Sequence, residues 1–244
     1  MKYFFLTLLL LPIFAQAQTT GVSVDLIWEA DTYVPSFYQG HSQIAPASTV
    51  RVVALPVVST GNSINQVKVG DFRFQWEKDG QVVSNATGVG QNVLLYKAGT
   101  EDNNSIKVTI SNQVTGDVEA VKQLVLPVTN PRLVFYREDP LAGTEYHRAL
   151  VSGFNLTKPE ITVRAEPYFF SRGSVQGGQL SYLWSINNKK VISNTSDQQL
   201  VTFATPREGS GQNQIQLEVN NLGSAFQSAK NFFQITFNQQ QVSF

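Results

Sequence analysis

Phe72-Arg-Phe-Gln-Trp-Glu-Lys-Asp-Gly-Gln-Val82 is the stretch that indicates the fold of this chain. Apolar and polar residues alternate along its first part, so Phe72, Phe74 and Trp76 share one face of an extended strand while the polar residues share the other. Asp79-Gly80 follows, and both residues tolerate the positive φ of a tight hairpin turn. The stretch therefore predicts a half-buried strand that turns back on itself.

The same pattern recurs in the second half of the chain as Leu180-Ser-Tyr-Leu-Trp-Ser-Ile-Asn-Asn-Lys-Lys-Val191. Trp76 and Trp184 are 108 residues apart (184 − 76), and the flanking blocks 50–56 and 161–167 are 111 residues apart (161 − 50). Such a spacing is the length of a domain and far exceeds a solenoid repeat. The chain is therefore interpreted as two related domains in tandem.

Strand-like segments separated by Gly, Asn, Asp and Ser clusters account for most of both halves. The predicted strands cover 22–30, 49–58, 71–78, 80–85, 91–96, 104–112 and 117–128 in the first half, and 131–137, 160–170, 179–186, 188–193, 198–204, 212–221 and 224–238 in the second. No helix is predicted. Seven short strands per half are typical of an immunoglobulin-like sandwich. The fold class is therefore all-β, with two tandem immunoglobulin-like β-sandwiches.

The first residues have the composition of a signal peptide. Lys2 precedes an apolar run that ends at Phe14, and Ala15-Gln-Ala17 supplies small residues before a cleavage site. We expect a signal peptide at 1–17, a first domain at 18–129 and a second at 130–244. The apolar run is shorter than the roughly 20 residues of a membrane-spanning helix, so a retained anchor is the weaker alternative. The sequence therefore predicts export to the cell surface, the extracellular medium or a periplasm-like space.

Composition limits the partners and the means of stabilisation. The chain has no cysteine, so each domain must be held by apolar packing, for which about 110 residues suffice. The chain has 18 basic residues (Lys and Arg) and 18 acidic residues (Asp and Glu), and no basic run is present. Nucleic acid and anionic membranes are therefore not expected partners. The link at 127–132 contains two prolines, which predicts restricted motion between the domains.

A long aromatic connection follows the first strand of each half, at 28–41 and 136–150. In the first half it provides four candidate ligand-binding residues, Tyr33, Phe37, Tyr38 and His41, because exposed aromatic rings bind glycans or peptides by stacking and apolar contact. The alternative, which we favour, is that these rings cover the open end of the sandwich or fill an interface between the domains. The two central Trp residues are interpreted as core.

Two groups of residues are candidate metal ligands. His41 and His147 are near carboxylates in sequence but have no HxH, HxxxH or HExxH spacing, so we expect both at the surface or in an interface. Glu101, Asp102 and Asn103 form a dense oxygen-donor cluster in a loop, which calcium binds in some extracellular sandwiches. The cluster lacks the order of a calcium-binding loop, so a solvated turn is the main interpretation and calcium the alternative. No other cofactor is predicted.

Catalytic motifs are missing from the sequence. It contains no Gly-x-Ser-x-Gly elbow, no cysteine nucleophile and no phosphate-binding glycine loop. Paired carboxylates, as in glycosidases, have no sequence signature of their own and stay open as an alternative. The sequence therefore predicts a protein that is not an enzyme.

The Trp strands with their hairpins resemble bacterial surface domains of the immunoglobulin-like and polycystic-kidney-disease-like kinds, although the Trp-Asp-Phe-Gly-Asp-Gly signature of the latter is missing. Four segments, at 26–35, 48–54, 139–150 and 164–171, are similar to a family of exported two-domain proteins of ultrasmall candidate-phyla bacteria. That resemblance spans nearly the whole chain after residue 17. It implies a bacterial source and export, and it implies no activity.

Together these features predict an exported, non-catalytic cell-envelope or cell-surface protein. Its paired domains would mediate protein–protein interaction or adhesion through loops and strand edges, with another envelope or surface protein as the partner. The alternative is a carbohydrate-binding module that uses the aromatic loop 33–41 to bind a glycan. A membrane is a partner only if the signal segment is retained.

Overall fold

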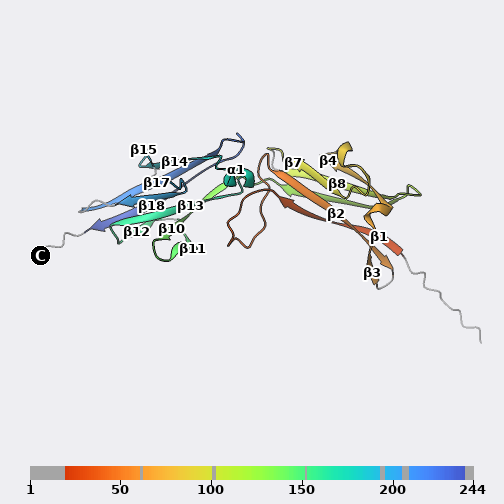
Figure 1. Ribbon diagram of the computed structural model, residues 1–244, viewed down its shortest axis with the longest axis horizontal. Helices are drawn as coiled ribbons and strands as arrows, with labels where there is room; N and C mark the ends of the chain where they lie inside the picture. The colour runs from red at the N-terminus through yellow and green to blue at the C-terminus, as the bar shows by residue number, and fades with distance from the viewer. Residues whose placement is uncertain are drawn as a thin grey trace, which may run out of the picture.

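A computed structural model describes residues 20–60, 63–100, 103–151, 153–192, 196–204 and 209–239. The protein is nearly all β, and two β-sandwiches lie end to end in an elongated molecule (Figure 1). The predicted signal peptide at 1–17 lies outside the described residues. Within the described part of the chain, no helix is long and apolar enough to cross a membrane.

The first sandwich pairs two antiparallel sheets. One contains β1 (Thr20–Ala30), β2 (Thr49–Thr60), β3 (Ser63–Gln66) and β7 (Val93–Lys97), with β2 bonded to the other three. The other contains β4 (Phe72–Lys78), β5 (Gln81–Val82), β6 (Gly88–Val89), β8 (Asn103–Asn112) and β9 (Val118–Pro127). Two 3₁₀ turns, Val69–Asp71 and Ser84–Ala86, flank β4 and β5.

The second sandwich also has two sheets. One has the order β11 (Gly143–Ala149), β10 (Arg132–Asp139), β13 (Glu160–Tyr168) and β16 (Leu200–Ala204). The other has the order β12 (Phe154–Leu156), β18 (Ser228–Gln239), β17 (Gly209–Asn221), β14 (Leu180–Ile186) and β15 (Lys189–Val191). A five-residue helix, α1 (Arg172–Gln176), follows β13 on the side of the first sandwich (Figure 1).

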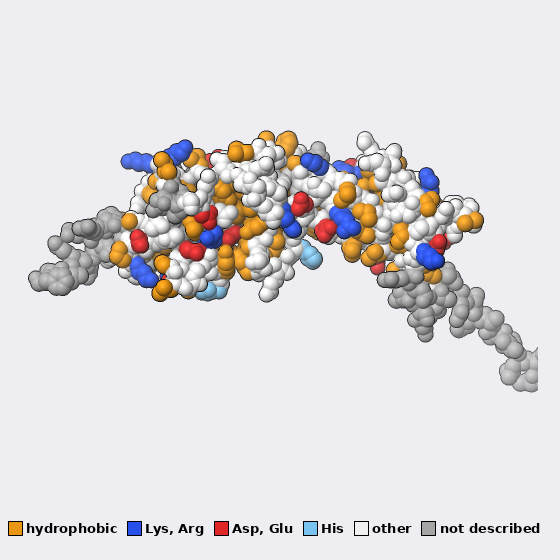
Figure 2. Space-filling model, in the orientation of Figure 1, with side chains coloured by type: hydrophobic (Ala, Val, Ile, Leu, Met, Phe, Trp, Pro, Cys, Tyr) orange, Lys and Arg blue, Asp and Glu red, His pale blue; other side chains and the backbone are white. Residues whose placement is uncertain are grey.

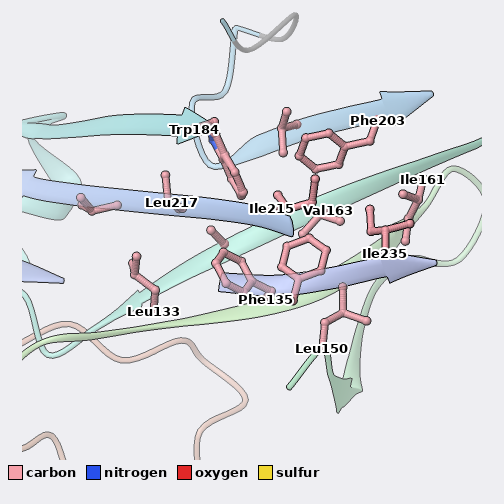
Figure 3. Close-up of a cluster of buried hydrophobic side chains, with 14 of the residues drawn as sticks. Leu133, Phe135, Leu150, Ile161, Val163, Trp184, Phe203, Ile215, Leu217 and Ile235 are labelled. Carbon is pink, nitrogen blue, oxygen red and sulfur yellow. The ribbon is translucent and has the colours of Figure 1, made fainter. Parts of the chain in front are cut away.

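Each sandwich has its own core, and the two Trp residues are central to them. Trp76 and Trp184 are fully buried, and their indole N–H groups donate to the carbonyls of Gln91 at 2.8 Å and Gln198 at 3.1 Å. Figure 3 shows Trp184 and Phe203 above Phe135 in the second core, with the ring centroids of Phe135 and Trp184 5.8 Å apart. The predicted core role of both Trp residues is confirmed.

The hairpin after each Trp strand is also confirmed. Asp79 and Gly80 have φ of 51° and 80°, and Asn187 and Asn188 have φ of 47° and 66°. Two consecutive residues with positive φ form the turn whose twist matches that of antiparallel strands. The strands they join are β4 with β5 and β14 with β15.

Several expectations differ from the structure. The prediction of no helix is wrong at α1, where the 170–178 loop closes a helical turn with Val175 N–H bonded to the Ser171 carbonyl at 3.1 Å. The expected strand 80–85 ends at Val82, because the chain enters a 3₁₀ turn at Ser84. Four short strands, β3, β6, β11 and β12, were not predicted. All pair with a longer neighbour, and short segments stabilised by such pairing have little sequence signal of their own.

Candidate functional site

The aromatic connection of the first half lies at the junction of the two sandwiches. We call residues 31–48, between β1 and β2, the junction loop (Figure 1). Tyr33 N–H donates to the carbonyl of Phe170 at 2.7 Å, and Phe169 N–H donates to the carbonyl of Tyr33 at 2.8 Å. These bonds resemble those of an antiparallel ladder, and Thr32 forms an isolated β-bridge with Ser171. Backbone hydrogen bonds therefore join the sandwiches directly.

Aromatic rings pack around this backbone contact. Phe37 stacks on Tyr146 of β11 with ring centroids 3.9 Å apart, and its edge faces Tyr136 of β10. Tyr38 meets Tyr168 edge to face at 5.6 Å. The second aromatic connection, at 136–150, is thus a hairpin of β10 and β11 that packs against the first. These contacts favour the alternative interpretation of the aromatics, an interface between the halves.

Of the four candidate ligand-binding residues, three therefore contact the second sandwich. Tyr33, Phe37 and Tyr38 are half-buried there, whereas His41 is exposed. His147 is also exposed, on β11, so both histidines lie at the surface as expected. Glycan binding at the four residues stays a prediction, although the packing of three rings leaves less of their faces for a sugar.

The candidate calcium ligands are not placed by the structure. Glu101 and Asp102 lie outside the described residues, and only the backbone of Asn103, the first residue of β8, is described. Calcium binding there stays a prediction. Elsewhere in the described chain, no three His, Asp or Glu side chains come together in a way that could hold a metal ion.

A buried carboxylate lies beneath the junction loop. Glu166 of β13 is only 3% exposed, and it accepts hydrogen bonds from Tyr33 Oη at 3.2 Å and Tyr146 Oη at 3.1 Å. Tyr33 belongs to the first sandwich and the other two residues to the second. The carboxylate therefore links the halves through a side-chain bridge in addition to the backbone bonds.

Burial dominates the electrostatics of Glu166. Removal from water raises the pKa of this carboxyl above its ordinary value, and the two tyrosine hydrogen bonds and nearby Arg164 only partly offset that. Asp197, the other charged group acting on it, also raises the pKa. The pKa of Glu166 is higher in the folded state than in the unfolded state. Its contribution to the stability of the folded protein is therefore fully present below the unfolded-state pKa and is lost as the pH rises through the folded-state pKa.

We therefore predict that Glu166→Gln flattens the pH dependence of stability. Gln keeps a side-chain acceptor and removes the buried charge, so the melting temperature of the variant at pH 8 should equal or exceed that of wild type. Thermal unfolding of both proteins between pH 4 and pH 8 measures this. Glu138→Gln, which changes a partly exposed carboxylate on the neighbouring strand, is the control. A variant with the same pH slope as wild type would refute the assignment of that slope to Glu166.

Gln227 is the junction residue that sequence reasoning missed. Its side chain is 1% exposed and its amide nitrogen donates to the carbonyl of Pro46, in the junction loop, at 2.8 Å. Its amide oxygen accepts from the backbone N–H of Ser171 and from the side-chain amide of Asn221, both at 2.8 Å. One glutamine therefore joins the junction loop, the start of α1 and the end of β17. No periodicity or motif distinguishes it from the many exposed Gln residues of the chain.

A cavity of about 370 Å³ lies on the second sandwich beside β12, and its lining includes Glu138, Asp139 and Glu160. Glu138 accepts hydrogen bonds from Arg164 Nε and Thr144 Oγ1. Asp139 accepts from two backbone N–H groups, which lower the pKa of its carboxyl. A glycosidase requires one carboxyl with a raised pKa, to act as the acid. The two backbone hydrogen bonds to Asp139 suit an ionised group, so Asp139 does not fit the acid of such a carboxylate pair.

An apolar surface faces outward from the first sandwich. Along β1, β2 and β7 the inward side chains are core, and Ile27, Val53 and Val93 lie side by side on the outer face, with Leu55 and Leu95 in the adjacent rows. We call these five residues the outer apolar face. Figure 2 shows hydrophobic side chains beside acidic and basic ones on the half of the molecule formed by the first sandwich.

Neither the protein-family models nor the curated proteins include a match to this chain. Solved structures similar to it include fibronectin(III)-like and immunoglobulin modules. The fibronectin(III)-like modules of Clostridium thermocellum CbhA share 9% identity over 89% of this chain and 97% of theirs, with a TM-score of 0.27. The Ig1-2 module of the Drosophila receptor protein tyrosine phosphatase DLAR shares 10% over 88% and 99%, also with a TM-score of 0.27.

A third similar structure is the C-terminal 282-residue fragment of intimin in complex with the intimin-binding domain of its translocated receptor. It shares 9% identity over 78% of this chain and 60% of that fragment, with a TM-score of 0.26. Sequence identities and TM-scores this low do not indicate a partner for this chain. The arrangement of its own sheets and cores identifies this chain as a protein of two immunoglobulin-like sandwiches.

Proposed function

We propose that this chain is an exported, non-catalytic protein of the cell envelope or cell surface that binds another protein through the outer apolar face. The apolar run after Lys2 and the resemblance to exported two-domain proteins support export. The observation that carries the proposal is the outer apolar face itself. An antiparallel sheet that faces water normally has polar residues on its outer side, and here five neighbouring outward positions are apolar.

The chemistry of the face suits a protein partner. Ile27 is 54% exposed, so much of its side chain is in contact with water in the isolated molecule. Glu29 and Arg51 form an exposed ion pair at 3.3 Å next to the apolar residues. An apolar centre beside charged groups is the usual composition of a protein interface, and contiguous exposed apolar patches mark such sites. The partner therefore presents its own apolar surface, with charges that complement this pair.

The junction determines how the face is presented. Backbone bonds, stacked rings and the Glu166 and Gln227 bridges all connect the sandwiches, so the face has one orientation relative to the second sandwich. A partner bound on the first sandwich is thereby held at a defined position along the molecule. This suits a role in a surface assembly better than a role as a flexible tether.

We predict that Ile27→Lys strongly weakens partner binding. The introduced charge loses its water on association, and burying an unpaired charge costs several kcal/mol, so binding should weaken at least tenfold. The measurement is site-specific photo-crosslinking in cells that make the protein, with a photo-reactive amino acid at Leu95. Wild type should give a discrete crosslinked product that the variant lacks.

Val121→Lys is the matched control, because Val121 is also 54% exposed and lies on β9, in the other sheet of the same sandwich. It should leave the crosslinked product unchanged. Equal crosslinking by wild type and Ile27→Lys, or loss of the product in Val121→Lys alone, would rule out the outer apolar face as the binding surface.

A further inference from the structure

The second sandwich has an open strand edge. β12 is the end strand of its sheet, and it pairs in parallel with β18, with Phe154 opposite Ile235 and Leu156 opposite Phe237. Among the residues that the structure describes, no strand pairs with its other edge. An edge of this kind has backbone N–H and C=O groups ready to pair with an added strand.

The 370 Å³ cavity lies directly beside that edge. Phe154 and Leu156 of β12 and Ile161 of β13 give it apolar walls, and these residues come from the two different sheets. The cavity is therefore a gap between the sheets at the side where the sandwich ends. Its volume is within the range of ligand-binding pockets, and an apolar lining with a few polar groups is typical of them.

We propose that this gap binds an extended segment of a partner polypeptide, which adds to β12 as a strand and places alternate apolar side chains in the cavity. Alternate residues of a strand point to the same side, about 7 Å apart. A strand beside β12 therefore directs every second side chain between the sheets and the others toward solvent. This site is on the second sandwich and is separate from the outer apolar face, which is on the first.

Backbone and cavity together select a peptide over other ligands. A small apolar molecule would fill the cavity and leave the β12 edge unpaired, whereas a strand satisfies both, as in other cases of strand addition. The cavity lining has three carboxylates, Glu138, Asp139 and Glu160, against two cations, Arg137 and Lys158. The excess of negative charge favours a Lys at the flank of the bound segment. Since β12 has three residues, the pairing is short, and the cavity side chains supply much of the affinity.

The test uses a set of synthetic peptides of pattern Lys-X-Thr-X-Thr-X-Lys, in which X is Val, Ile, Leu or Phe. A second set has the same composition with the three apolar residues contiguous, and a third has the alternating pattern with N-methylated Thr amides. NMR titration of the full chain follows the amides of Phe154 and Ile161. Saturable shifts confined to β12 and the cavity lining are expected with the alternating set, and at least tenfold weaker binding with the other two.

Protein variants locate the site. Thr157 is exposed and lines the cavity, so Thr157→Trp should weaken the best alternating peptide at least tenfold. Asn155 is exposed between Phe154 and Leu156 on the opposite face of β12, so Asn155→Trp should leave binding unchanged. No saturable binding by any alternating peptide would overturn the proposal. So would equal binding of the N-methylated set, which would show an apolar pocket without strand addition. Ile27→Lys should not affect any of these titrations, which separates this site from the outer apolar face.

Discussion

Trp76→Ala should lower the free energy of unfolding of the first sandwich by about 3–5 kcal/mol. Trp76 is fully buried among the apolar residues of β4, β8 and their neighbours, so the change leaves a cavity that the surrounding strands only partly fill. It also leaves the Gln91 carbonyl without the indole N–H that donates to it at 2.8 Å. Urea unfolding followed by circular dichroism measures the loss.

The same experiment tests whether the two sandwiches are separate folding units. Core residues of the first lie between 24 and 126 and those of the second between 133 and 237, without a shared member. The variant should therefore unfold in two transitions. At urea concentrations between them the first sandwich is unfolded, and Trp184 is still buried in the second. Trp76→Phe, which keeps most of the apolar volume, should lose clearly less. A single transition for Trp76→Ala, or a loss below about 1.5 kcal/mol, would contradict the independence of the cores or the role of Trp76.

Gln227→Leu should lower the free energy of unfolding by about 3 kcal/mol, which is a large effect for the loss of one glutamine. Leu has a similar size, but the side-chain amide of Asn221 and the carbonyl of Pro46, both buried, and the half-buried backbone N–H of Ser171 all lose their hydrogen-bond partner. Each unsatisfied buried group costs about 1–3 kcal/mol. The measurement is again equilibrium unfolding, with hydrogen exchange at the junction loop as a local reporter.

Gln212→Leu is the control for that variant. Gln212 is exposed on β17, where its amide donates to Gln234 at 2.8 Å, so its loss should change stability by less than about 0.5 kcal/mol. Equal effects of the two substitutions would show that the Gln227 side chain does not hold the junction. Faster exchange in the loop should accompany Gln227→Leu only.

The parts of the fold that were predictable are local. The alternation of Phe72, Phe74 and Trp76 gives their strand and its buried face, and the Asp79-Gly80 and Asn187-Asn188 pairs give the turns, because both signals lie within a few residues. The domain limits 18–129 and 130–244 stay a prediction that the two-transition experiment tests. The separate cores are in keeping with it.

The junction was not predictable in detail, because its contacts join distant parts of the chain. Tyr33 and Glu166 are 133 residues apart in sequence, and neither has a neighbour pattern that identifies the other. The aromatic composition of the loop indicated that something is bound or packed there, and left open which. Phe169, with φ of 66°, also has no sequence signal, since bulky residues rarely adopt the left-handed region.

The outer apolar face had a partial signal. Val52-Val-Ala-Leu-Pro-Val-Val58 is a continuous apolar run, which is typical of strands buried on both sides. Sequence alone does not show which side is covered. In the structure the even-numbered residues from Val50 to Pro56 are buried, and Val53 and Leu55 face outward.

Whether the junction makes one rigid unit of the two sandwiches is measurable by distances between spin labels. The chain has no cysteine, so Lys122→Cys on β9 and Lys190→Cys on β15 give one unique pair of labels, both at exposed positions in different sandwiches. Pulsed electron paramagnetic resonance should give a single narrow distance distribution, which broadens when Gln227→Leu is added. A broad distribution in the otherwise unchanged chain, the same with and without Gln227→Leu, would mean that the sandwiches move independently and that the junction does not orient the outer apolar face.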